Sequence, residues 1–267
     1  MQVKEQLIKY THHGDVRIYM IGDEHCGTQH HHASLLKKTI DKIKNDPTAY
    51  WVGMGDKCEF ITPSDPRWDS GGISDWLHPD NISYDEINYY CDTFTPIKDK
   101  CIGLIEGNHE DSIHKHDHID VQRNICKALG VDNLSYSSFI RFQFRRGRSS
   151  ERRALTGFFT HGAGCAITSG AKLTRLQRLM DSFDADMVAQ GHVHDLLIYE
   201  KPYMTLDNSG HIKQKVRIGA LTGCYFRTYT QGVPSSYGEK KNYPPVTLGS
   251  IVYIYNPSTG LLRAEKV

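Results

Sequence analysis

The 267-residue sequence lacks a long hydrophobic run, since none of its apolar segments approaches the roughly 18–20 residues needed to span a bilayer. The N-terminal segment MQVKEQLIKY also lacks the apolar core of a signal peptide, so we expect a cytoplasmic protein without a membrane partner. None of the seven cysteines forms a Cys-x-x-Cys pair, and their number is odd. Both features argue against a disulfide framework and against a zinc ribbon.

The chain also lacks an excess of charge, because 32 Lys and Arg residues stand against 31 Asp and Glu residues, for a net charge of +1. This balance argues against a surface built wholly for wrapping duplex DNA. Hydrophobic residues at 39% and charged residues at 24% are typical of a globular protein with a sizeable core. We find no internal repeat, low-complexity tract or linker, so residues 1–267 are predicted to form a single domain.

What the sequence does contain is a series of short apolar runs, each followed by a glycine or polar residue and then by metal-binding residue types. Near-continuous apolar runs are typical of strands that are buried on both faces. The predicted strands are Val16–Ile21, Tyr50–Met54, Cys101–Glu106, Ala154–Thr160 and Met187–Gln190. They lead into the motifs GDEHCG, GDKC, GNHED, HGAG and GHVHD, respectively.

The spacing of apolar residues predicts helices over Ser34–Lys44 and Lys172–Phe183, between these strands. Alternating strands and helices indicate an α/β fold, in which ligands bind at the carboxyl ends of the strands. All five motifs fall at such ends. In the last third of the chain, turn residues separate paired apolar segments, which predicts antiparallel hairpins. These pairs are Ile198–Thr205 with Ile212–Ile218, and Ile251–Tyr255 with Leu261–Ala264.

The residues that follow the strands have the chemistry of a metal site. Carboxylate, amide oxygen and imidazole together suit borderline or hard divalent ions, without thiolate. One carboxylate that bridges two ions would hold them roughly 3.5–4 Å apart, and Asp56 is the candidate because it is the lone acid at its strand end. The full set is Asp23, His25, Asp56, Asn108, His109, His161, His192 and His194.

The motif order Asp-x-His, Gly-Asp, Gly-Asn-His-Glu, His-Gly and Gly-His-x-His, between Gly22 and His194, resembles the calcineurin-like metallophosphoesterase superfamily. The resemblance implies a four-layer α/β/β/α sandwich of two mixed β-sheets flanked by helices. It also implies two divalent metal ions as cofactors, with Mn²⁺ expected first and Fe, Zn, Ni or Mg as alternatives. One ion would take Asp23, His25, Asp56 and His194, and the other would take Asp56, Asn108, His161 and His192.

Within Gly-Asn-His-Glu, the resemblance assigns Asn108 to a metal ion and leaves His109 for catalysis. We predict that His109 protonates the leaving group of a phosphoester, or holds the scissile oxygen as a cation. Glu110 or Asp111 could orient the second ring nitrogen of His109. Three further histidines are expected in a polar loop that enters a helix near Ile119–Leu129, without a chemical role. They are His114, His116 and His118.

Two groups of residues near the motifs are open to two interpretations. His30–His32 are expected to begin a helix as exposed first-turn residues, although one of them could face a substrate. Cys26, Cys58 and Cys165 lie within a few residues of the proposed ligands. We expect these cysteines to be buried core thiols rather than metal ligands or redox groups.

Three longer segments lie outside the ligand set, and substrate choice must come from such segments. Residues 57–100 form a long excursion between two motifs, interpreted as a substrate-side insertion that walls the metal pocket or as a packing insert. Residues 220–246 carry aromatic and basic side chains that could bind nucleic acid, or form an oligomer contact or a rim loop. Arg141–Arg153 predict a hairpin whose basic tip either follows a nucleic-acid backbone or is simply solvated.

Together, the motifs favour a dinuclear-metal-dependent phosphoester hydrolase. We predict a phosphodiesterase that acts on a nucleotide or a nucleic acid, because aromatic and basic segments lie near the motifs. The motif style is closest to bacterial nucleases and phosphodiesterases of the superfamily. The protein Ser/Thr phosphatases continue the second motif with Asp-Arg-Gly, whereas here Asp56 is followed by Lys57-Cys58-Glu59-Phe60.

Three alternatives stand beside this prediction. The first is a phosphomonoesterase, including a protein phosphatase. The second is a non-catalytic binding module on the same scaffold, although such proteins typically lose ligand residues and this chain keeps all of them. The third is a metal-dependent amidohydrolase barrel, whose His-x-His pair would be expected near the first strand, whereas here the pair closes the series. The sequence leaves the oligomeric state open.

Overall fold

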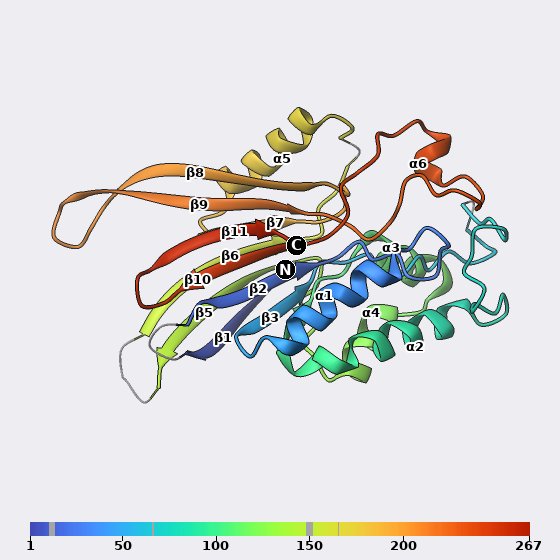
Figure 1. Ribbon diagram of the computed structural model, residues 1–267, viewed down its shortest axis with the longest axis horizontal. Helices are drawn as coiled ribbons and strands as arrows, with labels where there is room; N and C mark the ends of the chain where they lie inside the picture. Colours follow the sequence, from blue (N-terminus) through green and yellow to red (C-terminus); the bar gives the residue numbers. More distant parts are fainter. Residues whose placement is uncertain (11–13, 66, 148–151, 165) are drawn as a thin grey trace.

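The computed structural model describes residues 1–10, 14–65, 67–147, 152–164 and 166–267. Two β-sheets face each other, and helices cover the outer face of each sheet, which gives four layers in the order α/β/β/α (Figure 1). Both sheets are mixed, since each contains parallel and antiparallel neighbours. The predicted fold class is therefore confirmed.

The larger sheet has six strands in the order β1-β5-β6-β7-β9-β8. Strands β6, β7 and β9 run parallel and form the centre of this sheet. Strand β5 is antiparallel to β6 on one side, and β8 is antiparallel to β9 on the other. The bounds are β1 Gln2–Tyr10, β5 Ser137–Arg146, β6 Arg152–Thr160, β7 Met187–Gln190, β8 Leu196–Leu206 and β9 Ile212–Thr222.

The smaller sheet has five strands in the order β11-β10-β2-β3-β4. The neighbouring strands β2, β3 and β4 are parallel, and β10 of the C-terminal hairpin β10–β11 pairs with β2 in antiparallel fashion. The bounds are β2 Val16–Ile21, β3 Ala49–Gly53, β4 Cys101–Leu104, β10 Ile251–Asn256 and β11 Leu261–Lys266.

Most helices cover the smaller sheet, and α5 covers the larger one (Figure 1). Within the described residues, no helix is long and apolar enough to cross a membrane. The bounds are α1 Ala33–Asn45, α2 Ile82–Phe94, η1 Thr95–Lys100, α3 Asn108–Asp117, α4 Val121–Leu129, α5 Ser169–Ser182 and α6 Tyr237–Lys240.

The space between the two sheets is filled by side chains that alternate along the strands. Met20 of β2, Phe142 and Phe144 of β5 and Tyr253 of β10 meet there and are fully buried. On the opposite face of the smaller sheet, Trp51 packs under the helices and its Nε1 donates to the carbonyl oxygen of Ile97 at 2.9 Å. The inner strands are thus covered on both faces, which explains their near-continuous apolar sequences.

The loop that links β4 to α4 departs from the prediction, because His114 and His116 lie on helix α3 rather than in a polar loop. Within α3, only Ile113 adds a buried apolar side chain to the core, so the segment has no apolar period to reveal a helix. The helix ends where His118 adopts a left-handed conformation with a φ angle of 58°.

The histidine run after the first motif also departs from the prediction, because helix α1 begins at Ala33 and His30–His32 precede it. His30 is buried rather than exposed, and its Nδ1 lies 3.1 Å from the hydroxyl of Thr230. Contacts with the distant segment around Thr230, rather than the local sequence, therefore determine the environment of this histidine.

The β8–β9 hairpin is longer than predicted and projects beyond the body of the molecule (Figure 1). Near its base, Ile198 and Ile218 pack into the core between the sheets. Further out, the same face carries Met204, Leu206 and Ile212, which are exposed because the smaller sheet does not extend this far.

The buried hydroxyl of Tyr253 gives a test of the packing between the sheets, because it donates to the carbonyl oxygen of Val188 at 2.8 Å. Tyr253→Phe removes this hydrogen bond, so we expect the free energy of unfolding in urea to fall by about 1–2 kcal/mol. The matched control is Tyr84→Phe, at an exposed tyrosine, and should change it by less than about 0.5 kcal/mol. Equal stability of the two variants would contradict this account.

Candidate metal centre

The strand ends that carry the predicted ligands share an unusual backbone conformation. Non-glycine residues rarely adopt a positive φ angle, and each one costs on the order of 1–3 kcal/mol. A left-handed residue shortly after a strand turns the chain sharply and here brings side chains of separate loops to one place. Five predicted ligands have this conformation: Asp23 (51°), His25 (48°), Asp56 (52°), His192 (68°) and His194 (47°).

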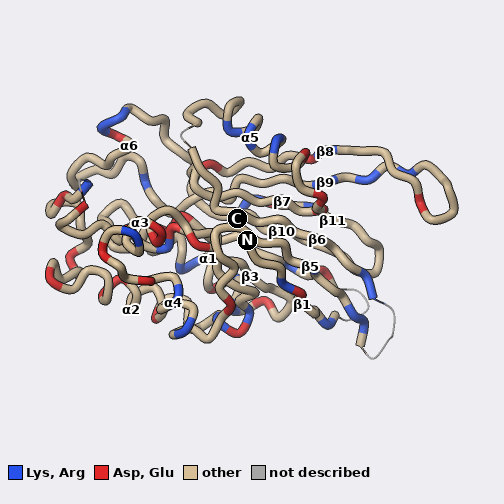
Figure 2. The backbone as a smooth tube through the Cα atoms, turned by 180° about the vertical axis from the view of Figure 1, so that it is seen from behind, with Lys and Arg blue, Asp and Glu red and all other residues tan. Residues whose placement is uncertain are grey.

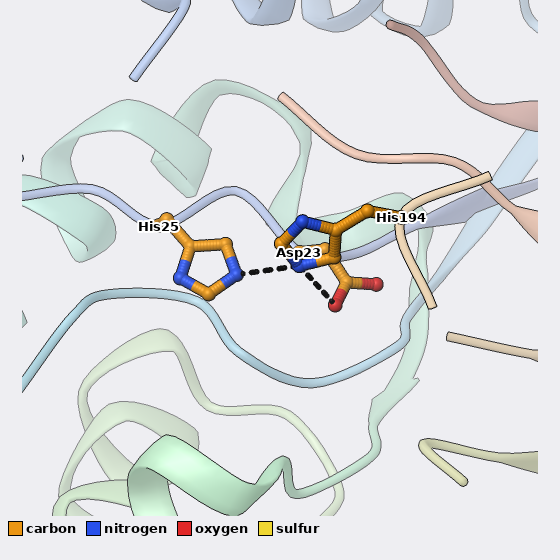
Figure 3. A group of neighbouring side chains, drawn as sticks. All are labelled: Asp23, His25 and His194. Atoms are coloured by element: carbon orange, nitrogen blue, oxygen red, sulfur yellow. Dashed lines mark hydrogen bonds and ion pairs between the residues drawn. The ribbon is translucent and has the colours of Figure 1, made fainter. Parts of the chain in front are cut away.

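The first cluster consists of Asp23 and His25, after β2, and His194, after β7 (Figure 3). The Nε2 atoms of His25 and His194 lie 3.0 Å apart, and the Nε2 atom of His194 lies 3.3 Å from Oδ1 of Asp23. One potential ligand atom from each of the three residues lies within 4.8 Å of the other two. Two imidazole nitrogens that point at each other beside a carboxylate fit a shared cation.

The second cluster consists of Asp56, His161 and His192, and Asn108 borders it. The Nε2 atom of His161 lies 3.1 Å from Oδ2 of Asp56 and 3.0 Å from Oδ1 of Asn108. The same Oδ2 of Asp56 lies 4.0 Å from Nε2 of His25. Asp56 therefore stands between the two clusters, where a bridging carboxylate is predicted.

Hydrogen bonds behind the clusters determine how the ligands are presented. His161 Nδ1 lies 2.8 Å from the carbonyl oxygen of Met54, which can only accept, so Nδ1 carries a proton and Nε2 is the ring nitrogen that faces the site. The Asp23 carboxylate accepts from the backbone N–H of His192 at 3.0 Å. The buried Nδ1 of His192 finds no hydrogen-bond partner among the described residues, which suits a metal ligand.

The electrostatics of the site favour bound cations. Burial alone would raise the pKa of Asp56, but His161 and His109 hold it well below the usual range, so the carboxylate is ionised. Burial would lower the pKa of His161, yet Asp56 and Asp23 raise it to about 9. His192 has a lowered pKa because of burial and the neighbouring His161. The converging carboxylates thus attract positive charge into a buried site.

The predicted catalytic residue His109 is positioned by Glu59, which the sequence interpretation missed. The Nδ1 atom of His109 lies 2.6 Å from the Glu59 carbonyl oxygen and 3.6 Å from its Oε2. Glu59 Oε1 also lies 3.2 Å from Nδ1 of His25. Burial opposes ionisation of Glu59, but His25 and His109 lower its pKa to about 2. The available signal was an acid three residues after Asp56 in the same loop.

Glu110 does not orient His109, which corrects the prediction. Its carboxylate instead joins the loop of Asp56 to the loop of Gly107. Its carboxylate accepts from the backbone N–H groups of Gly107 at 2.7 Å, Lys57 at 2.8 Å and Asp56 at 3.1 Å. The fully buried Lys57 ammonium lies 3.3 Å from the same carboxylate. Asp111, the other residue considered, pairs with Lys115 on the outer side of α3.

The close approach of these loops explains the glycine before Asn108. A Cβ atom at Gly107 would lie only 2.2 Å from both the backbone nitrogen and Oδ1 of Asp56. No side chain fits there, so the residue must be glycine if Asp56 and Asn108 are to reach the same site.

A cavity of about 880 Å³ opens over the metal clusters. Two segments form its walls, residues 57–81 with Arg67 and Trp68, and residues 226–246 with Phe226 and Tyr237. An ion pair between Lys240 and Asp69 at 3.4 Å joins the two walls. The predicted substrate-side segments therefore both border the clusters, although α2 within residues 57–100 also packs into the core.

Charged side chains are distributed unevenly around the molecule. Acidic residues gather in the loops beside α3, and basic residues recur along the β8–β9 hairpin (Figure 2).

Strand β5 starts next to the site and runs away from it. Just before this strand, the carbonyl oxygen of Tyr136 accepts from the backbone N–H of His161 at 3.2 Å. Strands β5 and β6 form the predicted basic hairpin, but its tip includes residues 148–151, which lie outside the described residues. Cys165 also lies outside the described residues.

No protein-family model matches the chain, and no curated protein matches it. A solved structure of a predicted phosphoesterase from Streptococcus pneumoniae is 10% identical with a TM-score of 0.33, covering 95% of this chain and 99% of that chain. NAD nucleotidase from Haemophilus influenzae is 11% identical with a TM-score of 0.40, covering 96% and 50%. A calcineurin-like phosphoesterase from Bacillus subtilis is 12% identical with a TM-score of 0.40, covering 96% and 90%. These values decide neither family nor activity, so the site geometry carries the functional proposal.

The buried pair of Lys57 and Glu110 provides a test of how the ligand loops are held. Glu110→Gln keeps the size of the side chain but removes its charge and one acceptor, which leaves the Lys57 ammonium buried without a counter-charge. We expect the free energy of unfolding to fall by about 3–5 kcal/mol, measured by urea denaturation. Asp111→Asn, at the next residue of the same helix, is the control and should have little effect. An equally small effect of both substitutions would contradict the proposed role of Glu110.

Proposed function

We propose that this protein is a dinuclear-metal-dependent phosphoester hydrolase of the calcineurin-like metallophosphoesterase type, and that its substrates are phosphodiesters of the nucleotide or nucleic-acid class. The observation that carries the proposal is the position of Asp56, whose carboxylate stands between an Asp–His–His cluster and a His–His–Asn cluster. A carboxylate shared between two sets of nitrogen and oxygen ligands is the arrangement that two-metal phosphoesterases require.

Asp23, His25, Asp56 and His194 would hold one divalent ion, and Asp56, Asn108, His161 and His192 would hold the other, with Mn²⁺ proposed first. The ions would supply Lewis-acid charge for the phosphoryl oxygens and lower the pKa of an attacking water. The protein's own contribution is to fix these ligands before substrate binds. The hydrogen bonds from His192 N to Asp23 and from His161 Nδ1 to Met54 serve this purpose.

His109 is proposed to donate a proton to the leaving oxygen, or to hold that oxygen as a cation. Its Nδ1 is engaged by the carbonyl oxygen of Glu59 at 2.6 Å, so Nε2 is the atom left for the substrate. Its ring packs edge-on against that of His25, with centroids 4.9 Å apart, so it lies beside the first cluster. The ionised Glu59 carboxylate lies 3.6 Å from Nδ1 of His109 and orients the ring for this role.

The walls of the cavity support the proposed diester preference. Phe226 stands over the first cluster, with ring centroids 5.2 Å from His25 and 5.8 Å from His194. Arg67 on the facing wall is held by Asp65 through Nε at 3.0 Å and Nη2 at 2.6 Å, which pre-organises its guanidinium. An aromatic ring and a fixed cation that line the same cavity suit a phosphate with two organic groups.

The reaction class is tested with simple aryl esters. The protein loaded with Mn²⁺ should hydrolyse bis(p-nitrophenyl) phosphate with a higher kcat/KM than p-nitrophenyl phosphate, because the cavity accommodates both aryl groups. Phe226→Ala should reduce this preference by about tenfold, since stacking is worth on the order of 1–3 kcal/mol. A strong preference for the monoester would favour a phosphomonoesterase, and no hydrolysis of either ester would oppose the proposed activity.

The role of His109 is tested separately from metal binding. In His109→Ala the backbone N–H that donates to Asp56 at 3.0 Å remains, so two ions should still bind by elemental analysis. Turnover should fall by about 10²–10⁴-fold, because a general acid contributes that much. Glu59→Gln should lower turnover less, and His114→Ala, an exposed histidine on the same helix, should not change it. Full activity of His109→Ala would show that another group protonates the leaving oxygen.

A further inference from the structure

Two thiols stand opposite each other on neighbouring ligand loops. Cys26 directly follows His25, and Cys58 lies two residues after Asp56. The loops pair as an isolated parallel bridge, in which Cys26 N donates to Lys57 O at 3.0 Å and Glu59 N donates to Cys26 O at 2.9 Å. Paired residues on adjacent strands have Cα atoms about 5 Å apart, which falls within the range that a disulfide spans.

The side chains of both bridge residues are fully buried. Cys58 Sγ also lies 3.5 Å from the carbonyl oxygen of Glu86, to which it can donate. None of the other cysteines in the described part of the chain stands opposite a second cysteine in a strand pair or bridge.

His31 provides a proton acceptor next to this pair. Its Nδ1 lies 2.6 Å from the carbonyl oxygen of Glu24, which can only accept, so Nδ1 carries a proton. Its Nε2 is then free to accept and lies 3.9 Å from Cys26 Sγ. The structure therefore places an acceptor beside one thiol and a second thiol opposite it.

We propose that Cys26 and Cys58 form an oxidation site at which a peroxide converts the thiol pair into a disulfide. The Cys26 sulfur attacks one peroxide oxygen and the O–O bond breaks, which gives a sulfenic acid. The leaving hydroxide takes up the thiol proton and departs as water. The Cys58 sulfur then attacks the Cys26 sulfur, forms the S–S bond and releases a second water. Overall, two thiols and one hydrogen peroxide give one disulfide and two waters.

The disulfide joins the loop of Asp23 and His25 covalently to the loop of Asp56. Both backbones are already paired there, so the bond forms without a large rearrangement of the ligands. Its expected physical effect is a higher thermal midpoint of the oxidised protein, because the cross-link restricts the unfolded chain. This inference does not depend on the proposed phosphoesterase activity.

The test is chemical and uses the full chain without substrate. The protein is treated with hydrogen peroxide, its remaining thiols are alkylated in denaturant, and the products are analysed by mass spectrometry. Trypsin is expected to release Ile18–Lys37 and Cys58–Arg67, each with one of the two cysteines. We expect these peptides to be linked, with a mass about 2 Da below their sum, and to separate after reduction.

Cys26→Ser and Cys58→Ser should each abolish the linked peptide, and Cys91→Ser, at a cysteine outside the bridge, should preserve it. If a serine variant fails to fold, the peptide map of the wild-type protein still decides the question. Recovery of both cysteines in alkylated form, a link to a different cysteine, or only sulfinic acid at either position would overturn the proposal. None of these outcomes bears on whether the protein hydrolyses phosphoesters.

Discussion

The buried contact between Glu110 and the loop of Asp56 is the interaction on which the rest of the site depends. One carboxylate receives three backbone N–H groups and the Lys57 ammonium, all in a region without solvent. The same ammonium donates to Ile105 O at 2.9 Å and to Gln122 Oε1 at 2.7 Å, so the second and third motifs and helix α4 are joined at one point. Because a buried charge is costly without partners, the complete network is stable and an incomplete one is not.

This network offsets a local cost. Five proposed ligands adopt left-handed backbone conformations that L-amino acids disfavour, and two histidine nitrogens face each other at 3.0 Å. Such an arrangement persists only where the surrounding structure over-determines it. The two packed sheets and the helices on both sides provide that rigidity, and divalent ions would replace repulsion within the clusters by attraction. Stability is thus concentrated in the strands, while chemical groups lie on the strained loops that follow them.

The same loops connect the metal clusters to the rest of the molecule in different directions. Glu59 joins His109 to His25, Phe226 covers the histidines of the first cluster, and the thiol pair of Cys26 and Cys58 lies behind the ligands. A single turn between Asp56 and Glu59 therefore contributes a proposed bridging ligand, a buried cation, an oxidisable thiol and a positioning carboxylate. Catalytic geometry and loop chemistry are consequently hard to change independently in this protein.

Some features of this protein could be predicted from the sequence and others could not. Five strands and the convergence of Asp23, His25, Asp56, His161 and His194 follow from apolar runs that end in metal-binding residues, because parallel strands place their carboxyl ends at one edge. The layered architecture was implied by the resemblance of the motifs to a known superfamily, and strand β1 was not predicted. Helix α3 was missed because its charged sequence has no apolar period. The burial of His30 and the contacts of Glu59 and Glu110 were missed because they join loops that are distant in the sequence.

The sequence by itself therefore determined which residue types stand at the ends of the strands and the order in which they occur. Only the tertiary structure decided which carboxylate orients His109, which one holds the ligand loops together, and that Cys26 stands opposite Cys58. The physical reason is that periodicity and turn chemistry act over a few neighbouring residues. Contacts between loops depend instead on sheet register and on side-chain packing at distances of a few ångströms.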